Sequence, residues 1–146
     1  MRTLVWRGLD EPRMEIVRAD ARERADGTQI GLAYELRWRL DGDRLDVETV
    51  GERQATIELG DCDFFDLGYS AYFNSLPVWR DGFDEAREYT MRFVSVPSLE
   101  ATPVRQRYEP LGGRVIRYSS GDFEADIEFD PDGFVSLYRD FLERIA

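Results

Sequence analysis

The side chains that could do chemistry in this chain are mostly carboxylates, because it contains neither histidine nor lysine. Its charged residues are 30 acids and 19 arginines, and its only cysteine is Cys62. Without histidine the chain cannot build a Ser-His-Asp or Cys-His nucleophile, and without lysine it has no P-loop or Schiff base. General acid–base catalysis is left to Asp, Glu, Tyr and Cys62, including a carboxylate pair of the glycosidase type. No two acids stand out as such a pair, so we expect a protein that is not an enzyme.

The same inventory limits metal binding. One cysteine and no histidine do not make a zinc site of the ordinary type, so we expect no transition metal and no cofactor. Asp61, Asp63 and Asp66 form a D-x-D-x-x-D pattern whose oxygens could hold calcium or magnesium. Acids make up a fifth of the chain, however, and a solvated acidic loop explains the pattern as well. Cys62, placed between two of these acids, is interpreted as a small structural residue.

A second group of candidate residues lies in an aromatic-rich stretch, whose rings belong to Tyr69, Tyr72, Phe73, Trp79 and Phe83. Within it, Asn74 is the only asparagine of the chain, and Arg80 follows Trp79. Aromatic faces beside one amide and one guanidinium suit a sugar or another polar head group. Alternatively, the aromatic residues pack in the core, Asn74 fixes a turn, and Pro77 gives that turn an extended exit.

The excess of acidic residues limits which partners the protein can bind and which cellular compartment suits it. A net charge of -11 repels phosphate backbones and anionic membranes, so we expect no nucleic-acid partner. The use of arginine alone fits a GC-rich genome, whereas the acid excess favours a halophilic protein of a salt-rich cytoplasm. Residues 1–9 do not read as a secretory signal, and no apolar run is long enough to span a bilayer. With a single cysteine as well, the sequence predicts a cytoplasmic protein.

The same net charge predicts that salt stabilises the fold. At -11 the folded chain repels itself, and salt screens this repulsion over a Debye length of about 10 Å at 0.1 M. The melting temperature should therefore rise as salt is increased from low to molar concentration in a thermal-unfolding series. A melting temperature that stays flat or falls across the series would contradict the idea.

The elements that must position these side chains are predicted to be strands. The 146 residues fit one domain, 1–146, and the dominant pattern is alternation of apolar and polar residues, which is typical of strands with one buried face. The clearest cases are residues 30–40, from Ile30 to Leu40, and residues 123–129, from Phe123 to Phe129.

Turn signals separate these segments into hairpins. They lie at Asp41–Asp43, Gly51, Gly112–Gly113 and Asp130–Gly133. Together they predict a mainly β protein, an antiparallel meander of about ten strands curled into a barrel or half-barrel. Tyr138, Phe141, Leu142 and Ile145 recur at helical spacing, which predicts a short C-terminal amphipathic helix.

Several short motifs resemble those of a known family. Phe73–Val78, with the sequence FNSLPV, resembles the T/F-N-T/S-L-P-I/V motif of the putative glycolipid-binding family of prokaryotic proteins. Further similar segments follow in the family's order over residues 60–146: Val96–Leu99, Gln106–Tyr108, Arg117–Tyr118, and Asp130 with Asp132–Val135. Tyr138 and Phe141 stand where the family has a Y-P-G-L-F ending, although this chain lacks the Pro-Gly.

The resemblance implies a fold and a function. The fold would be an incomplete barrel like that of bacterial lipoprotein carriers, in which a curved sheet wraps a helix or a lipid chain. The function would be to bind a small amphipathic ligand, such as a glycolipid, in an apolar concave face with a polar rim. The rim would be formed by Asn74, Arg80, Arg105 and Arg107, and the lining by Trp38, Phe73, Trp79 and Tyr108.

The alternative is a non-catalytic structural or interaction domain whose barrel interior is filled by its own side chains. A carrier keeps a cavity of a few hundred Å³, whereas a packed interior has few voids larger than a water molecule.

Overall fold

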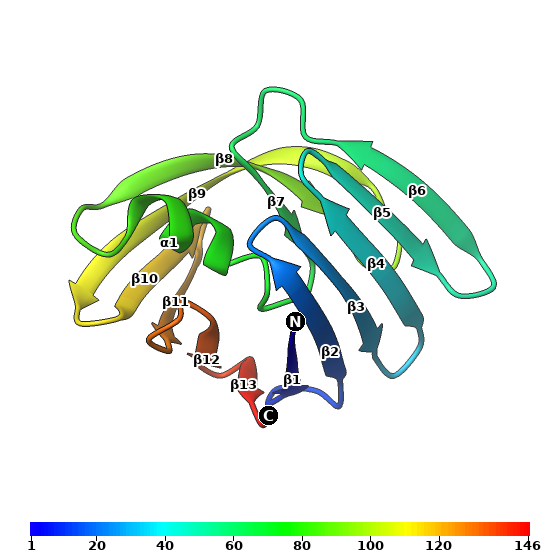
Figure 1. Ribbon diagram of the computed structural model, residues 1–146, viewed down its shortest axis with the longest axis horizontal. Helices are drawn as coiled ribbons and strands as arrows, with labels where there is room; N and C mark the ends of the chain where they lie inside the picture. Colours follow the sequence, from blue (N-terminus) through cyan, green and yellow to red (C-terminus); the bar gives the residue numbers. More distant parts are fainter.

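The computed structural model describes residues 1–146, with the exception of the side chain at position 21, and consists of one curled sheet and one short helix (Figure 1). The elements in chain order are β1 (Arg2–Gly8), β2 (Met14–Ala21), β3 (Arg24–Ile30), β4 (Glu35–Asp41), β5 (Arg44–Thr49), β6 (Arg53–Glu58), β7 (Phe64–Leu67), α1 (Ser75–Asp81), β8 (Arg87–Val94), β9 (Ala101–Gly112), β10 (Val115–Ser120), β11 (Phe123–Phe129), β12 (Val135–Tyr138) and β13 (Leu142–Arg144).

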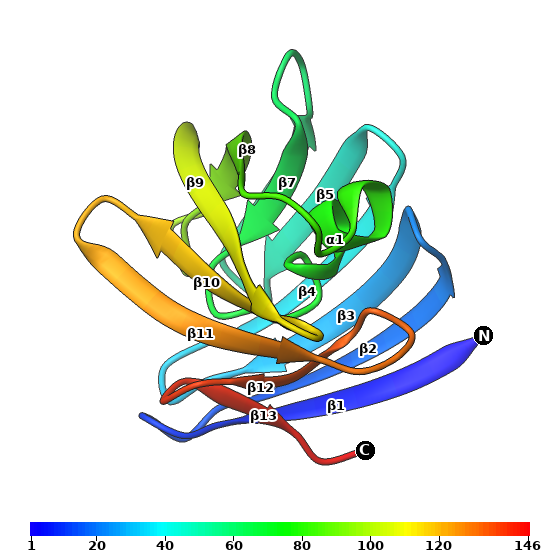
Figure 2. The ribbon, with the colours of Figure 1, turned by 90° about the vertical axis from the view of Figure 1, so that its left-hand side faces the viewer.

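The thirteen strands form a single sheet in the order β6-β5-β4-β3-β2-β1-β13-β12-β11-β10-β9-β8-β7. Two meanders, β1–β6 and β8–β13, are therefore joined by the antiparallel pair of β1 and β13. Strand β7 adds to the outer edge of the second meander, where it pairs parallel to β8. Among the described strands β6 and β7 are not paired with each other, so the sheet is a half-barrel that curls around α1 (Figures 1 and 2).

The sequence-based prediction of a mainly β half-barrel is confirmed, and so are most of its turns. Gly42 takes a φ of 59° between β4 and β5, a left-handed conformation that glycine adopts without strain. Gly51 and Gly112–Gly113 also lie at hairpin turns, and residues 123–129 form β11 as expected.

Two of the predicted elements are wrong in detail. Residues 30–40 are not one strand: Ile30 ends β3, a turn follows, and β4 begins at Glu35. The turn is closed by a hydrogen bond from the Gly31 amide to the Tyr34 carbonyl, and it leaves Leu32 exposed to solvent. The C-terminal helix is replaced by β12, a turn at residues 139–141, and β13.

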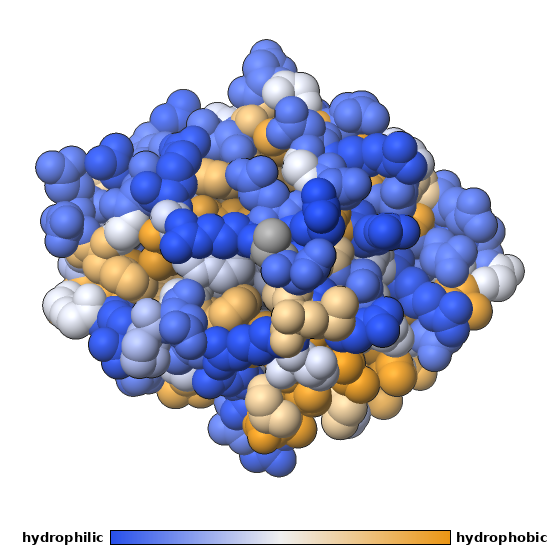
Figure 3. Space-filling model, viewed as in Figure 1, coloured by the Kyte–Doolittle hydropathy of each residue, from blue (hydrophilic) through white to orange (hydrophobic). Residues whose placement is uncertain are grey.

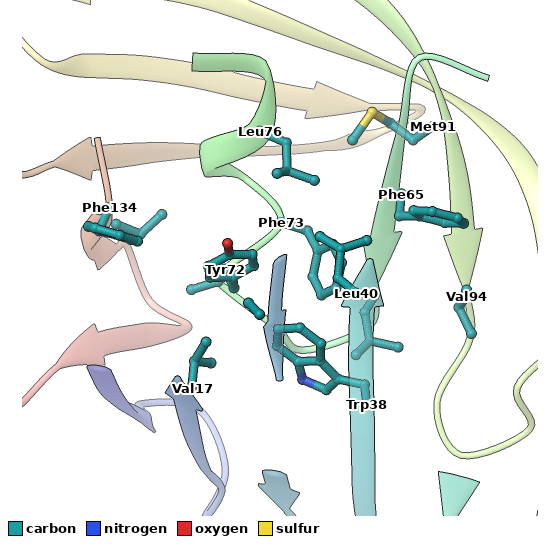
Figure 4. Packing of buried hydrophobic residues seen from close by; sticks show 14 of the residues in the cluster. Val17, Trp38, Leu40, Phe65, Tyr72, Phe73, Leu76, Met91, Val94 and Phe134 are labelled. Atoms are coloured by element: carbon teal, nitrogen blue, oxygen red, sulfur yellow. The ribbon is translucent and has the colours of Figure 1, made fainter. Parts of the chain in front are cut away.

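The interior of the half-barrel is filled largely by the chain itself. The segment that leads from β7 into α1 places Tyr72 and Phe73 against Trp38 of β4, with ring centroids 5.5 and 4.9 Å from the Trp38 ring (Figure 4). Gly27 of β3 pairs with Trp38, and a Cβ atom at that position would lie 2.4 Å from the indole. A side chain larger than glycine is therefore excluded opposite Trp38, because cores are packed too tightly to absorb it.

Candidate functional site

A pocket of about 350 Å³ remains between the segment that follows β7 and the inner face of the second meander. It lies at the end of the half-barrel that carries the β1–β2, β8–β9, β10–β11 and β12–β13 turns. It is lined by Arg13, Asp66, Leu67, Gly68, Tyr69, Ser70, Asn74, Phe93, Ser95, Val96, Tyr118, Phe123, Tyr138, Phe141 and Leu142. Most of these side chains are apolar or aromatic and only a few are polar, which is the usual composition of a small-molecule site.

The buried end of this pocket carries a small polar cluster. Asp66 is buried, and its Oδ2 atom accepts a hydrogen bond of 2.7 Å from Nε2 of Gln106. Burial raises the pKa of Asp66 to about 6, although the hydrogen bond from Gln106 acts in the opposite direction. Asn74, which is 3% exposed, donates from Nδ2 to the Tyr108 hydroxyl at 3.1 Å. The Oδ1 atom of Asn74 and the Oε1 atom of Gln106 are buried without a hydrogen-bond partner among the described residues.

A second buried carboxyl lies behind the pocket wall. Glu15 of β2 is 1% exposed and accepts hydrogen bonds from Ser70 Oγ at 2.7 Å and from Trp38 Nε1 at 3.1 Å. Gln29 completes the set with a donor at 3.3 Å. Burial outweighs these hydrogen bonds and raises the pKa of Glu15 to about 7. Through the hydrogen bond of Ser70, this network holds the pocket-forming segment between β7 and α1 against the first meander.

The mouth of the pocket is aromatic. Tyr69 and Phe123 are 47% and 38% exposed, and the guanidinium of Arg13 lies 4.3 Å from the centre of the Tyr69 ring. Tyr69 has a φ of 63°, a strained conformation for a bulky residue that persists only where the surrounding structure enforces it.

The same end of the molecule exposes further apolar side chains, which lie in or directly beside the β1–β2 and β3–β4 connections and belong to Leu9, Met14, Ile30 and Leu32. Exposed apolar side chains therefore adjoin the end of the half-barrel where the pocket lies. Figure 3 shows the opposite end, with the chain termini toward the viewer, where apolar atoms gather along the lower edge and hydrophilic residues cover most of the face above it.

The residues predicted to bind a ligand do not all meet at this pocket. Asn74 lines it, and Tyr108 lies directly behind Asn74 through their hydrogen bond. Trp38 and Phe73 are packed in the core against each other and are outside the pocket lining. The side chain of Asn74 makes no cap at the start of α1, so the predicted role of its amide in fixing a turn is wrong.

Pro77 also differs from the prediction, because it lies inside α1 rather than in an extended exit. It is the third residue of the helix, and a proline there costs little because the first helical amides have no partner within the helix.

Trp79 and Arg80 lie at a second hollow of about 380 Å³ near the opposite end of the half-barrel. The Trp79 indole donates to the carbonyl of Asp132 at 2.8 Å, and the Arg80 guanidinium stacks on Phe64 and pairs with Asp81. Their polar groups are thus already engaged within the chain.

Arg105 and Arg107 lie on the outer face of β9, whereas Gln106 and Tyr108 point inward, as the alternation predicted. Arg105 pairs with Glu88 on that outer face. Neither arginine belongs to the lining of the pocket, so a ligand-binding role for the two remains a prediction.

The acidic triplet does not converge. Asp61 and Asp63 are exposed and Asp63 accepts the Thr90 amide at 2.8 Å, while Asp66 is buried at the pocket. No group of three or more metal-ligating side chains gathers among the described residues. The sequence left open whether Asp66 shares a cation site with the other two acids or lies with them in a solvated loop, whereas the structure places it in a buried polar cluster with Gln106. Sequence reasoning missed Glu15 entirely, because nothing in the local pattern distinguishes this acid from the other 29.

Comparisons with known proteins agree with this architecture. A crystal structure at 1.80 Å resolution of a DUF1089 family protein from Pseudomonas aeruginosa superposes with a TM-score of 0.64 at 20% identity, covering 99% of this chain and 94% of that one. This likeness establishes the shared fold. A search of curated proteins finds no match. Within the described residues, no helix is both long enough and apolar enough to cross a bilayer.

The family relationship comes from the sequence itself. The model of the family described as "Putative glycolipid-binding" matches residues 35–144, which extends well beyond the motifs noted between residues 60 and 146. The match includes the pocket-forming segment, α1 and all of the second meander. The chain therefore belongs to the putative glycolipid-binding family.

Proposed function

We propose that this protein binds a small amphipathic molecule, such as a glycolipid, in the pocket between the Asp66–Asn74 segment and the second meander, and that it is not an enzyme. The observation that supports this best is the pocket itself. Its volume of about 350 Å³ falls within the range of small-molecule sites, and a few buried polar groups interrupt its apolar lining. The core around Trp38 and Phe73 is packed, so the proposed site is confined to one end of the half-barrel.

The alternative of a domain with a completely packed interior is supported by this core but not by the pocket. An enzyme working through paired carboxylates finds less support, because Asp66 is the only acid in the pocket lining.

Filling the pocket should weaken ligand binding. Val96 lines the pocket beside Gly68, so Val96→Trp would occupy the space that a ligand needs. We expect the neutral fluorescent probe N-phenyl-1-naphthylamine to bind the unmodified protein, and its affinity to fall by about tenfold or more in this variant. Fluorescence titration measures both.

The matched control is Val50→Trp, which places the same bulk at an exposed position beyond β5 and outside this pocket. Its probe affinity should equal that of the unmodified protein. The proposal fails if the unmodified protein binds no probe, and also if the two tryptophan variants bind it equally well.

A further inference from the structure

The carboxylate and amide of the pocket are placed at its buried end. Asp66, Ser70 and Asn74 are all less than one-tenth exposed, whereas the mouth presents the exposed rings of Tyr69 and Phe123, with Arg13 stacked on Tyr69. Apart from Arg13, this is the reverse of the polar rim expected from the sequence. An amphipathic molecule at this site meets aromatic surface outside and polar atoms inside.

Four buried polar atoms lack a hydrogen-bond partner among the described residues, and the two that belong to the cluster around Asp66 are amide oxygens, which accept hydrogen bonds; the other two, Ser75 Oγ and Arg92 Nε, belong to residues outside the pocket lining. Oδ1 of Asn74 and Oε1 of Gln106 have no hydrogen-bond partner among the described residues, and the Asp66 carboxylate forms no ion pair there. Leaving a buried acceptor unpaired costs free energy that a donor from a ligand would recover. An anionic head group would instead add further acceptors beside the carboxylate.

No free cation in the lining offsets this excess of acceptors. Arg13, the only basic residue that lines the pocket, is paired with Asp10 at 2.7 Å and with Glu11 at 3.4 Å and stacks on Tyr69. Its charge is therefore compensated within the β1–β2 connection, and the pocket carries none of the unpaired arginines that bind phosphate or carboxylate groups.

We propose that the ligand enters with its polar head first, and that this head donates hydrogen bonds and carries no negative charge, as hydroxyl groups or a protonated amine do. The inference rests on the proposed function, since it specifies which ligands the same pocket accepts. The apolar part of the ligand then lies against the aromatic mouth and extends outward, because the pocket is too small for a complete lipid.

Four amphiphiles with the same alkyl chain test the selection of the head group. Octyl glucoside and octylamine donate hydrogen bonds, octyltrimethylammonium is a cation without a donor, and octyl sulfate is an anion. Isothermal titration below the micelle concentration of each should give affinities for the first two that are about tenfold or more above those for the last two.

Changing the carboxylate should reduce this selection. Asp66→Asn replaces one acceptor oxygen by a donor amide. It should therefore lower the binding affinities of octyl glucoside and octylamine and reduce the ratio of these affinities to that of octyl sulfate. The matched control is Asp63→Asn, three residues earlier, which lies outside this pocket and should leave all four affinities unchanged. Melting curves of both variants establish that they are folded.

The orientation is tested by nuclear Overhauser effects in the octyl glucoside complex. Sugar protons should contact the side-chain amide of Asn74 at the buried end, and the protons of the alkyl chain, rather than those of the sugar, should contact Phe123 at the mouth. The opposite pattern would overturn the head-first orientation. If octyl sulfate binds as well as octyl glucoside, the head-group selection is wrong while the proposed function stands. If neither the probe nor any amphiphile binds, the proposed function itself is wrong.

Discussion

Replacing Tyr108 by alanine should lower the free energy of unfolding by about 3–5 kcal/mol, as large aromatic truncations in protein cores do. Tyr108 is buried, and its ring packs edge-on against Tyr89 and Tyr118 at centroid distances of 5.4 and 5.8 Å. Its hydroxyl accepts the hydrogen bond of Asn74. Removal of the ring would leave a cavity behind the pocket and an Asn74 amide without its partner. Urea unfolding monitored by circular dichroism measures the loss.

Tyr108→Phe separates the two contributions. It retains the ring and removes only the hydroxyl, so it should cost about 1 kcal/mol, the usual scale for one intramolecular hydrogen bond. If Tyr108→Ala instead cost less than about 1 kcal/mol and abolished probe binding, Tyr108 would be part of the ligand site rather than of the core.

Stability should fall as the pH rises from 4.5 to about 7, because of Glu15. Its ordinary pKa is 4.5, and burial raises the pKa of Glu15 in the folded protein to about 7. Between these values the folded protein holds a proton that the unfolded chain has released, so each increase in pH favours unfolding. The total loss from this group is on the order of 3 kcal/mol. Asp66, whose pKa burial raises from 3.8 to about 6, contributes in the same direction at lower pH.

Glu15→Gln isolates the effect. The amide resembles the protonated carboxyl, so the variant should match the original protein near pH 4.5 and exceed it near pH 8. Glu52→Gln, at the exposed turn between β5 and β6, is the matched control and should leave the pH dependence unchanged. The measurement is urea unfolding across this pH range in high salt, which screens the repulsion of the acidic surface. A stability that rises steadily from pH 5 to 7 would contradict the assignment.

The parts of the fold that could be predicted are those in which a strand alternates large apolar residues with polar ones. Strand β4 was found because Leu36, Trp38 and Leu40 all point inward. Strand β3 was missed because its inward positions are Ala25, Gly27 and Gln29, which are small or polar. They are small because Trp38 occupies the space opposite, a relation between strands that no local pattern contains.

The predicted C-terminal helix failed for a related reason. The spacing of Tyr138, Phe141 and Leu142 suits a helix, but these residues come together around a turn at the pocket. Asp140 takes a φ of 69° there, which a right-handed helix cannot include. The hydrophobic residues therefore face the pocket from two short strands and the turn between them, rather than from one side of a helix.

The candidate site could be predicted only in part. The stretch around Asn74 was identified from its composition, and Asn74 does line the pocket. The importance of Asp66 and Glu15 depends on burial, which arises when β2, β7 and β9 come together and cannot be deduced from the neighbours of either residue in the sequence. The pocket itself is built from several turns that are distant in the chain.

The pairing of β1 with β13, which joins the two meanders, affects how a ligand bound in the pocket is released. The backbone ladder between them passes through β13, which has three residues and pairs with β1 over three positions and with β12 over two. Such a short ladder opens at a lower free energy than the ladders of six positions between β1 and β2 and of seven positions between β2 and β3. Because Phe141 and Leu142 line the pocket, fraying of β13 would detach one wall while both meanders stay folded. The residence time of a bound molecule would then depend on how long the pairing of β1 with β13 stays closed, more than on the width of the pocket mouth.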